Sequence, residues 1–469
     1  MPTSITPPPV SVMAMLLLSG LVSLGWAQDP ADRRELGADS SRRSLEPRLE
    51  EDWPDFLGKR RDGKSAETGL NWDWTTQPPQ VVWSRPLLGG YGIGSTAGGR
   101  FFQLDGDGDR SVLLCLNAET GEELWRHEYA MAYEDMYGFD NGPRASPVID
   151  EDRVYTLGVE GMVHCFDAVQ GQVLWSLDTT KRFHVRQNFF GVGSTPLVYR
   201  DLLLVMVGGS PAEGATSPPQ TLSDVAPNGS GIVALDKRNG EIRYQTIDDL
   251  ASYASPIVAP LNGRPTGLAF CREGLHAFRP ESGEVLWFFP WRARKYESVN
   301  ASTPVVTDLG ILLTESYGPG GVLLRLVDGS PQVIWRDENI RAQRLSCHWC
   351  TPVVHEGFAY ACHGEKPSQA ELRCVELATG EVRWSQVRLG RCNLSYADGH
   401  LICLSEGGQL FAVRATPERF ELAARWAPEA SSVSLRPPCY AAPVISRGRL
   451  YLRDARALYC LEMRSNREE

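Results

Sequence analysis

The chain has 469 residues, of which 42% are hydrophobic and 22% are charged, as is ordinary for a soluble globular protein. Its formal net charge of −11 and its pI near 5.4 argue against the basic face that nucleic-acid binding requires. After Ala27 no apolar run is long enough to cross a membrane as a helix, so we expect no internal membrane span.

The N-terminus differs in kind from the rest of the chain. Residues 1–27 contain the apolar run VSVMAMLLLSGLVSLGWA, which ends in small residues and predicts a secretory signal peptide cleaved after Ala27. No Lys or Arg precedes this run, so an uncleaved N-terminal anchor is the alternative. Residues 28–52 are highly charged and nearly free of aromatic side chains, which predicts a disordered linker. We therefore expect a periplasmic or extracellular protein whose folded part begins at residue 53.

One pattern then repeats along the chain and is clearest at residues 145–175, ASPVIDEDRVYTLGVEGMVHCFDAVQGQVLW. Four short β-type runs are separated by turns that contain Gly or Asp, which predicts a four-stranded antiparallel meander. One such sheet cannot bury both of its faces, whereas copies stacked around an axis can. The repeat therefore predicts an all-β fold, a β-propeller of four-stranded antiparallel blades.

Each unit ends on an aromatic residue, in most cases four residues after a Gly. The Gly permits positive φ at the last turn, and a large ring on the outermost strand can pack between one sheet and the next. Eight positions carry this blade-docking ring and predict eight blades: Trp83, Trp125, Trp175, Tyr244, Trp287, Trp335, Trp384 and Trp426. A Pro-, Ser- and Gly-rich insertion at 209–230 lengthens the fourth unit, counted from that of Trp83, and predicts a loop.

The two ends of the repeat region complement each other. The last unit, YAAPVISRGRLYLRDARALYCLEM, supplies three strands, and QVVWSRPL near the N-terminus is an outer strand with no inner strands before it. We predict that residues 80–87 complete the C-terminal blade and close the ring, which leaves no open edge. The propeller then spans residues 53–463 and is followed by a short tail at 464–469.

The innermost strands carry a second signature, a Pro that precedes Val, Leu or Ile. Pro is tolerated at the first residue of a strand. Six units show it: Pro147, Pro196, Pro256, Pro304, Pro352 and Pro443.

Eleven cysteines in an exported chain raise the question of disulfides. Four share one repeat position that other units fill with Ala, so we interpret them as small buried side chains: Cys115, Cys165, Cys374 and Cys460. The motif SCHWCT places Cys347 three residues before Cys350, with His348 between them. A Cys347–Cys350 disulfide, a disulfide to Cys392 or Cys439, a metal site and free core thiols are the interpretations left open.

The blade-closing pattern A-x-x-x-G-x-x-x-W, as in AETGEELW and LATGEVRW, resembles the repeat of the pyrroloquinoline-quinone (PQQ)-like β-propellers. This family includes quinoprotein alcohol dehydrogenases and the propeller lipoprotein of outer-membrane barrel assembly. The stretch WPDFLGKRRDGKSAETGL is similar to the opening of exported propellers of planctomycete-type bacteria. The resemblance implies an eight-bladed propeller outside the cytoplasm and leaves its function open.

For the dehydrogenases, the resemblance implies a quinone stacked on Trp, a Ca²⁺ held by Glu and Asn, an Asp base and a vicinal disulfide. This chain has no adjacent Cys-Cys pair. We therefore expect no catalytic residues, no resident metal and no cofactor, with PQQ and Ca²⁺ as the alternative.

Polar residues just before the inner strands are expected to ring one mouth of the central channel, where propellers commonly bind ligands. These candidate ligand-binding residues are Asp140, Asn141, Arg144, Asn188, Asn300, His348 and Asn393. A role in capping turns and strand starts is the alternative. We predict a monomeric scaffold that binds a protein or peptide partner in the cell envelope. The alternatives are a PQQ-dependent oxidoreductase and a protein that binds carbohydrates or small molecules at the channel mouth.

Overall fold

The computed structural model describes residues 52–186, 189–212, 225–293, 300–426 and 433–465. The chain divides into the units Met1–Arg43 and Ser44–Glu469, and every described residue belongs to the second. The predicted signal peptide, the charged linker up to residue 51, residues 213–224 of the predicted insertion and the tail from residue 466 lie outside the described residues. Within them, no helix is both long and apolar enough to cross a membrane.

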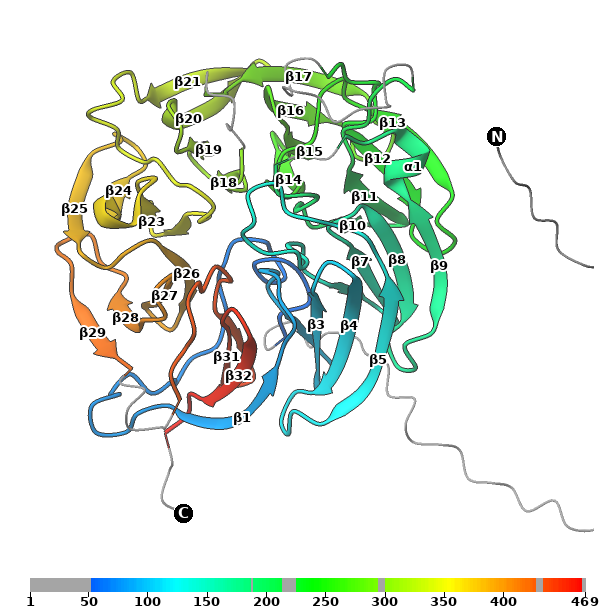
Figure 1. Ribbon diagram of the computed structural model, residues 1–469. Coiled ribbons are helices and arrows are strands. Elements are labelled where there is room, and N and C mark those ends of the chain that lie inside the picture. Colours follow the sequence, from blue (N-terminus) through cyan, green and yellow to red (C-terminus); the bar gives the residue numbers. More distant parts are fainter. Residues whose placement is uncertain (1–51, 187–188, 213–224, 294–299, 427–432, 466–469) are drawn as a thin grey trace, which may run out of the picture. The chain divides into compact units, whose positions relative to one another are not determined.

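The second unit is an eight-bladed β-propeller of four-stranded antiparallel blades, as the sequence predicts (Figure 1). Blade 1 is β2 (Ser95–Ala97), β3 (Arg100–Gly106), β4 (Arg110–Asn117) and β5 (Glu123–Ala130). Blade 2 is β6 (Val148–Asp150), β7 (Arg153–Leu157), β8 (Met162–Asp167) and β9 (Val173–Asp178), and α1 (Thr179–Phe183) follows it. Blade 3 is β10 (Leu197–Tyr199), β11 (Leu202–Met206), β12 (Ile232–Asp236) and β13 (Ile242–Thr246). Blade 4 is β14 (Ile257–Leu261), β15 (Arg264–Phe270), β16 (Gly274–Phe278) and β17 (Val285–Pro290).

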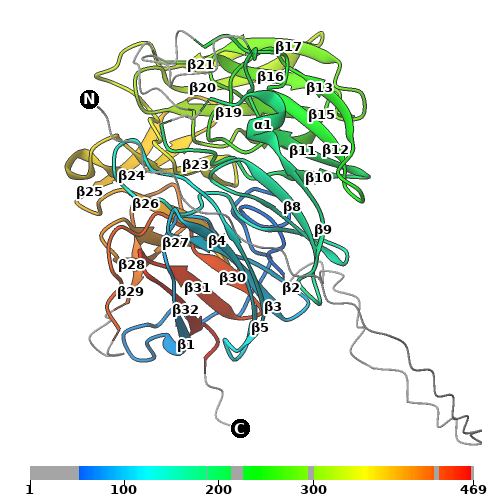
Figure 2. The ribbon, with the colours of Figure 1, turned by 45° about the vertical axis from the view of Figure 1, so that its right-hand side comes forward.

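The second half of the ring repeats the arrangement (Figure 2). Blade 5 is β18 (Val305–Thr307), β19 (Gly310–Glu315), β20 (Gly320–Val327) and β21 (Ser330–Arg336). Blade 6 is β22 (Val353–His355), β23 (Phe358–His363), β24 (Glu371–Glu376) and β25 (Val382–Val387), with the short 3₁₀ helix η2 (Pro367–Gln369) before β24. Blade 7 is β26 (Cys392–Ala397), β27 (His400–Ser405), β28 (Leu410–Arg414) and β29 (Leu422–Arg425). Blade 8 is β30 (Val444–Ser446), β31 (Arg449–Arg453), β32 (Ala457–Glu462) and β1 (Gln80–Pro86).

The ring closes where the sequence predicts. Strand β1 pairs antiparallel with β32, with Trp83 opposite Cys460 and Arg85 opposite Leu458. Blade 8 therefore has four strands like the other blades, and the pairing of β1 with β32 leaves neither strand without a neighbour.

The outer-strand rings dock blade to blade. The indole Nε1 of Trp83 donates a hydrogen bond to the carbonyl of Ala118 in blade 1 at 3.1 Å, and that of Trp335 donates to Leu377 at 2.7 Å. A Cβ on Gly121, which has φ of 71°, would lie 2.6 Å from the Trp83 ring. A Gly of this kind serves two purposes, because it closes its own hairpin and makes room for the ring of the preceding blade. Five turns have it: Gly121, Gly171, Gly240, Gly283 and Gly380.

Two docking rings depart from the repeat. Among the described residues, Trp287 is the one outer-strand ring without a hydrogen bond to the next blade, and no Gly of blade 5 packs against it. Trp426 lies just after β29, where Ala424 takes the repeat position opposite Ala412. Trp426 still docks, since its Nε1 donates to the carbonyl of Pro79 ahead of β1 at 3.2 Å.

The shared cysteine position is a small buried one, as interpreted from the sequence. Cys115, Cys165, Cys374 and Cys460 each pair with the docking ring of their own blade and are fully buried. In blade 5 the same buried position holds Leu323, which pairs with Trp335, so the position is apolar in every one of these blades but not always small.

The six prolines directly precede the inner strands, and the Ser or Thr before several of them links the blades. Thr195 accepts a hydrogen bond from the backbone of Ser146 at 3.0 Å, and Thr303 accepts one from Ser255 at 3.2 Å. The same contact joins Thr195 to Ser255 and Thr303 to Thr351. This hydroxyl belt runs around the channel from blade 2 to blade 6 and satisfies buried backbone N–H groups that no strand pairs.

A segment that the repeat did not predict fills one end of the channel. Residues 52–66 form a compact turn structure inside the ring, and we call them the plug (Figure 1). The buried Arg61 binds Asp55 at 2.6 Å and donates to the carbonyls of Pro196 and Pro256. Lys64 donates to the carbonyl of Val354 at 3.0 Å. The plug thus binds inner strands on opposite sides of the ring.

Candidate functional site

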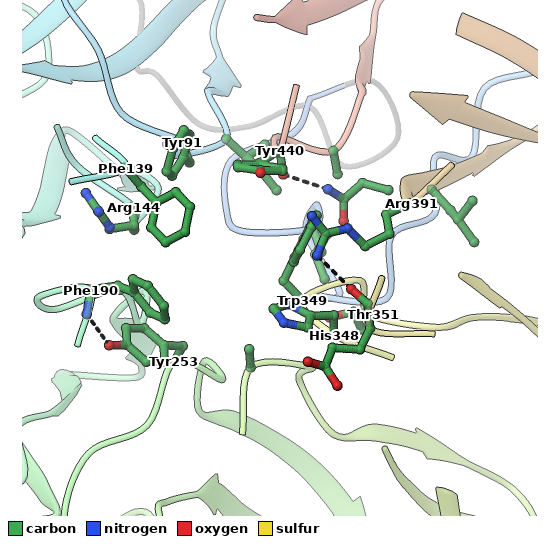
Figure 3. Close-up of a pocket in the computed structure, with 18 of the residues that line it drawn as sticks. Tyr91, Phe139, Arg144, Phe190, Tyr253, His348, Trp349, Thr351, Arg391 and Tyr440 are labelled. Carbon is green, nitrogen blue, oxygen red and sulfur yellow. Dashed lines mark hydrogen bonds between the residues drawn. The ribbon is translucent and has the colours of Figure 1, made fainter. Parts of the chain in front are cut away.

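A cavity of about 500 Å³ occupies the other end of the channel (Figure 3). Phe56 and Leu57 of the plug line its inner part, and residues just ahead of the inner strands β18 and β30, Ala301 and Ala442, line its sides. Its outer part is lined by loops that connect the outer strand of one blade to the inner strand of the next. The volume lies in the range of about 300–1,000 Å³ that is typical of ligand sites.

One wall of the cavity is aromatic. Phe139, Phe190 and Tyr253 pack together, with ring centroids 6.0 Å apart for Phe139 and Phe190 and 5.7 Å apart for Phe190 and Tyr253. The backbone N–H of Phe190 donates to the Tyr253 hydroxyl at 2.7 Å, which fixes this wall. Phe139 is 63% exposed and follows Met136 and Tyr137, which are also exposed. Apolar surface therefore continues from the cavity onto its rim, an arrangement that marks binding surfaces.

The opposite wall combines rings with polar groups. The Arg391 guanidinium lies 4.3 Å from the centroid of Trp349, and Trp349 packs edge-on against Tyr440 at 4.6 Å. Arg391 also binds Glu406 at 2.6 Å and donates to the carbonyl of Glu365 at 2.9 Å. Its charge is therefore balanced inside the protein, and its plane is held flat against the indole.

His348 and Trp349 present buried polar atoms with no partner. His348 Nε2 shares a hydrogen bond with the Tyr317 hydroxyl at 2.7 Å, whereas its Nδ1 and the indole Nε1 of Trp349 have none. Burial, with a smaller contribution from Arg391, lowers the pKa of His348 to about 3, so the imidazole is neutral at physiological pH. In Figure 3 the Trp349 ring lies across the cavity from Phe139 and Phe190. Buried polar atoms without partners are costly, which points to a ligand that supplies them.

Three of the seven candidate residues from the sequence line this cavity: Arg144, His348 and Asn393. Arg144 is paired with the buried Asp135 at 2.7 Å and lies 5.4 Å from the Tyr91 ring. The amide of Asn393 donates to the carbonyl of Tyr440 at 2.6 Å and positions that ring.

The other candidates do not reach it. Asp140 and Asn141 shape their own loop, accepting hydrogen bonds from the backbone of Gly142 and Asp135, and they line a separate shallow depression. Asn300 is buried and donates to the carbonyl of Cys271 at 2.7 Å, so it caps a turn. Asn188 lies outside the described residues.

The sequence reasoning missed the rings. It weighed polar residues ahead of the inner strands, whereas the lining is dominated by Tyr91, Phe139, Phe190, Tyr253, Trp349 and Tyr440. The usable signal was the presence of aromatic residues in blade-connecting loops, which the repeat itself does not require.

Cys347 and Cys350 are free, buried thiols in the structure. Cys347 packs with Leu345 and Trp335, whereas Cys350 packs with Cys362 and Cys392 in a different hydrophobic cluster. Neither thiol lines the cavity.

The lining does not fit a Ca²⁺-held quinone. Among the described residues around the cavity, Glu365 is the one carboxylate, and the Asn393 amide is engaged by Tyr440. Ca²⁺ takes six to eight oxygen ligands, several of them carboxylate, and this wall does not offer such a set.

The comparisons with known proteins agree with this fold. The sequence matches, over residues 74–386, the family described as outer membrane protein assembly factor BamB. The structure is similar to that of BamB from Moraxella catarrhalis, with a TM-score of 0.54 and 14% identity over 83% of this chain and 99% of that one.

It is also similar to a europium-containing methanol dehydrogenase, with a TM-score of 0.50 and 12% identity over 89% of this chain and 99% of that one. A quinohemoprotein alcohol dehydrogenase from Comamonas testosteroni gives a TM-score of 0.50 and 13% identity over 89% of this chain and 82% of that one. At these identities the structures establish the fold alone. No curated sequence matches the chain.

Proposed function

Because the chain belongs to the PQQ-like propeller family described as outer membrane protein assembly factor BamB, we propose that it is a non-catalytic scaffold of the cell envelope whose channel mouth binds a segment of a protein partner. The observation that carries the proposal is an aromatic cavity whose apolar lining continues onto an exposed rim. An extended polypeptide suits this shape, since one side chain can enter the cavity while its neighbours cover Met136, Tyr137 and Phe139.

The lining favours an uncharged segment. Arg144 and Arg391 are already paired with Asp135 and Glu406, and His348 is neutral because burial lowers its pKa to about 3. A charged side chain beside Arg144, Arg391 and His348 would meet groups that are already paired or neutral, and it would lose its hydration. Lys366, which also lines the cavity, is exposed to solvent. An uncharged segment can instead accept a hydrogen bond from the Trp349 indole and stack on the rings.

The same groups do not assemble a catalytic centre. General acid–base catalysis works best with a group whose pKa lies near the working pH, and the pKa of His348 lies far below it. The two cysteines of SCHWCT point into packing clusters, and burial raises the pKa of Cys347 to about 12, so this thiol is not a nucleophile.

A peptide-display library screened against the full chain tests the proposal, with affinities of selected synthetic peptides measured by fluorescence. Trp349→Ala should weaken binding by about 30-fold or more, as expected for a buried aromatic anchor. Phe139→Ala should weaken it less, because that ring lies on the rim. Ile340→Ala is the matched control, since Ile340 is 65% exposed but lies outside the cavity lining.

The proposal would be overturned if no peptide is selected, or if the selected peptides bind Trp349→Ala as tightly as the unaltered chain. Two further outcomes would replace it with another function. Oligosaccharides bind in place of peptides with the same dependence on Trp349, which would establish the carbohydrate alternative. Addition of PQQ with Ca²⁺ yields a bound chromophore and dye reduction with alcohols or sugars, which would establish the oxidoreductase.

A further inference from the structure

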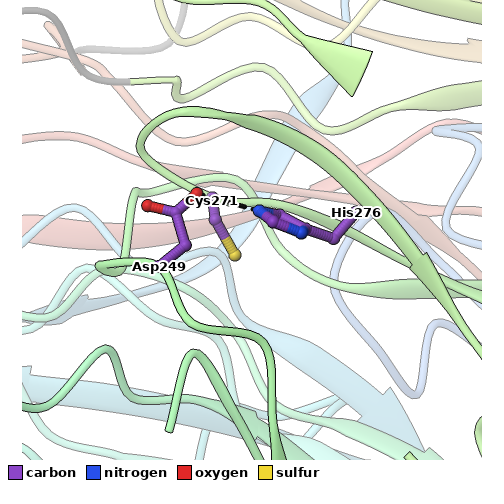
Figure 4. A group of neighbouring side chains, drawn as sticks. All are labelled: Asp249, Cys271 and His276. Atoms are coloured by element: carbon purple, nitrogen blue, oxygen red, sulfur yellow. Dashed lines mark hydrogen bonds and ion pairs between the residues drawn. The ribbon is translucent and has the colours of Figure 1, made fainter. Parts of the chain in front are cut away.

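A second cluster of chemically reactive side chains lies away from the mouth, between blades 3 and 4. Asp249 follows β13, Cys271 follows β15 and His276 lies in β16, and one ligand atom from each falls within 4.8 Å of the others (Figure 4). Among the described residues, this is the one group of three His, Cys, Asp or Glu side chains that converges in this way. From these three side chains we infer a Zn²⁺ site, with water in the fourth tetrahedral position, that fastens the loop after β13 to blade 4.

The donor set suits zinc. One thiolate, one imidazole and one carboxylate are all zinc ligands, and a thiolate is a poor ligand for Ca²⁺ or Mg²⁺. The two anionic ligands would balance the charge of a divalent ion, so the buried centre would be neutral overall. The His276 Nε2 and Asp249 Oδ2 atoms are already 3.0 Å apart, close to the spacing of two ligands on one tetrahedral ion.

Surrounding contacts hold two of the ligands in place. The Asp249 carboxylate accepts from the backbone of Leu250 at 2.7 Å and from that of Glu273 at 3.0 Å, which fixes its orientation. The His276 ring packs on Phe288 with centroids 4.5 Å apart. Such outer contacts are what orients ligands in metal sites.

The thiol is the feature that a simple Asp–His pair leaves unexplained. Cys271 is fully buried beside both groups, and its Sγ makes no hydrogen bond with any described residue. Cys115 and Cys165 differ, because each accepts a contact from an Arg side chain. Binding of a divalent ion would displace the thiol proton and leave the thiolate as a ligand.

The position of the cluster fits a structural role. Cys271 and Asp249 are buried, so no substrate reaches them, and the ligands come from blade 4 and from the loop that joins it to blade 3. This is also the junction where the docking ring is Tyr244 rather than Trp, which leaves a smaller ring between the blades. An ion here would strengthen the junction with the smallest docking ring.

The test uses the full chain, stripped with a chelator and titrated with Co²⁺ and then with Zn²⁺. We expect one equivalent of Co²⁺ to bind with a thiolate-to-cobalt charge-transfer band, Zn²⁺ to displace it, and Zn²⁺ to raise the melting temperature. Cys271→Ala should abolish the band, and His276→Ala should weaken binding by at least about 10- to 100-fold. Both variants should lose the Zn²⁺-dependent shift in melting temperature.

Matched controls come from blade 2, where His164 and Cys165 occupy the same strand positions as His276 and Ala277. His164→Ala and Cys165→Ala should retain the band and the full Zn²⁺ shift. Should Cys271→Ala fail to fold, Asp249→Asn keeps the shape of the side chain and should still weaken Co²⁺ binding. A chain without the band, a band that survives in Cys271→Ala, or a Co²⁺ affinity that is unchanged in Asp249→Asn overturns the inference, and none of these results bears on the peptide site.

Discussion

The two ends of the central channel are built from the same inner strands, but one end is filled by the chain itself and the other is an open cavity. At one end the chain fills its own channel, with Arg61 and Lys64 of the plug bound to carbonyls of three different blades. At the other end the strands open into a cavity of about 500 Å³ whose rim exposes Phe139. The difference teaches that the plug end is arranged for cohesion, whereas the mouth leaves large rings exposed on its rim, a feature that marks binding surfaces.

The contrast is sharpest at Arg61, where we expect the largest effect. Arg61→Ala leaves the carboxylate of Asp55 buried without its partner and should lower the free energy of unfolding by about 3–5 kcal/mol. Denaturant unfolding measures this loss. Arg60→Ala is the control, because Arg60 is 55% exposed and its pair with Asp62 contributes little.

The pH dependence of Arg61→Ala separates charge burial from lost packing. Burial already raises the pKa of Asp55 although Arg61 opposes it, and removal of the guanidinium raises it further. The folded variant then binds a proton more tightly than the unfolded chain. The loss of unfolding free energy that Arg61→Ala causes should therefore shrink as the pH falls below 7. A deficit that is the same at every pH would show that Asp55 is not the cause.

At the mouth, His348 should give the chain an acid-sensitive point. Its pKa is about 3 in the folded chain against 6.5 for an ordinary His, so the unfolded state takes up the proton first. The contribution of the neutral His348 to the free energy of unfolding is therefore fully present above pH 6.5. It is lost as the pH drops toward 3, by about 2 kcal/mol between pH 7 and pH 5. His348→Gln should remove this part of the slope in unfolding measured at several pH values. His355→Gln, at a more exposed position, should remove less, and equal slopes in both variants would contradict the prediction.

The blades could be predicted from the sequence because they repeat. A Gly four residues before a Trp indicates both a hairpin and a docked ring. The incomplete units at the two ends indicate that the ring of blades is closed by pairing of the first strand with the last. The plug could not be found in this way, since its residues occur once and carry no period. Its identity depends on Arg61 reaching Pro196 and Pro256, which are far from it in the sequence.

The mouth was predicted only in part, for a related reason. Arg144, His348 and Asn393 were found because polar residues precede inner strands, but so does Asn300, whose amide is used inside a turn. Sequence cannot tell these cases apart, because both satisfy the same local pattern. The rings of the cavity lie in loops of unequal length, whose convergence only the folded ring defines.

The hydroxyl belt between the two ends should show an intermediate cost. Thr303→Val keeps the shape of the side chain but leaves the backbone N–H of Ser255 without an acceptor. A buried donor without a partner costs about 1–2 kcal/mol, which thermal unfolding would detect. Thr307→Val, at a partly exposed position where the hydroxyl bonds within its own hairpin, should cost less. A larger loss at Thr307 would mean that the belt does not hold the blades together.

The smallest effect on stability should come from the mouth itself, at Trp349. Trp349→Phe removes the indole N–H, which is buried without a partner, and keeps a ring against Arg391. Its unfolding free energy should stay within about 0.5 kcal/mol of that of the unaltered chain, since lost stacking and a removed unsatisfied donor offset each other. Peptide affinity should nevertheless fall, by the roughly tenfold that one hydrogen bond of about 1.4 kcal/mol represents. A variant that loses stability but binds peptide normally would reverse the assignment, because it would place Trp349 with the groups that hold the ring together.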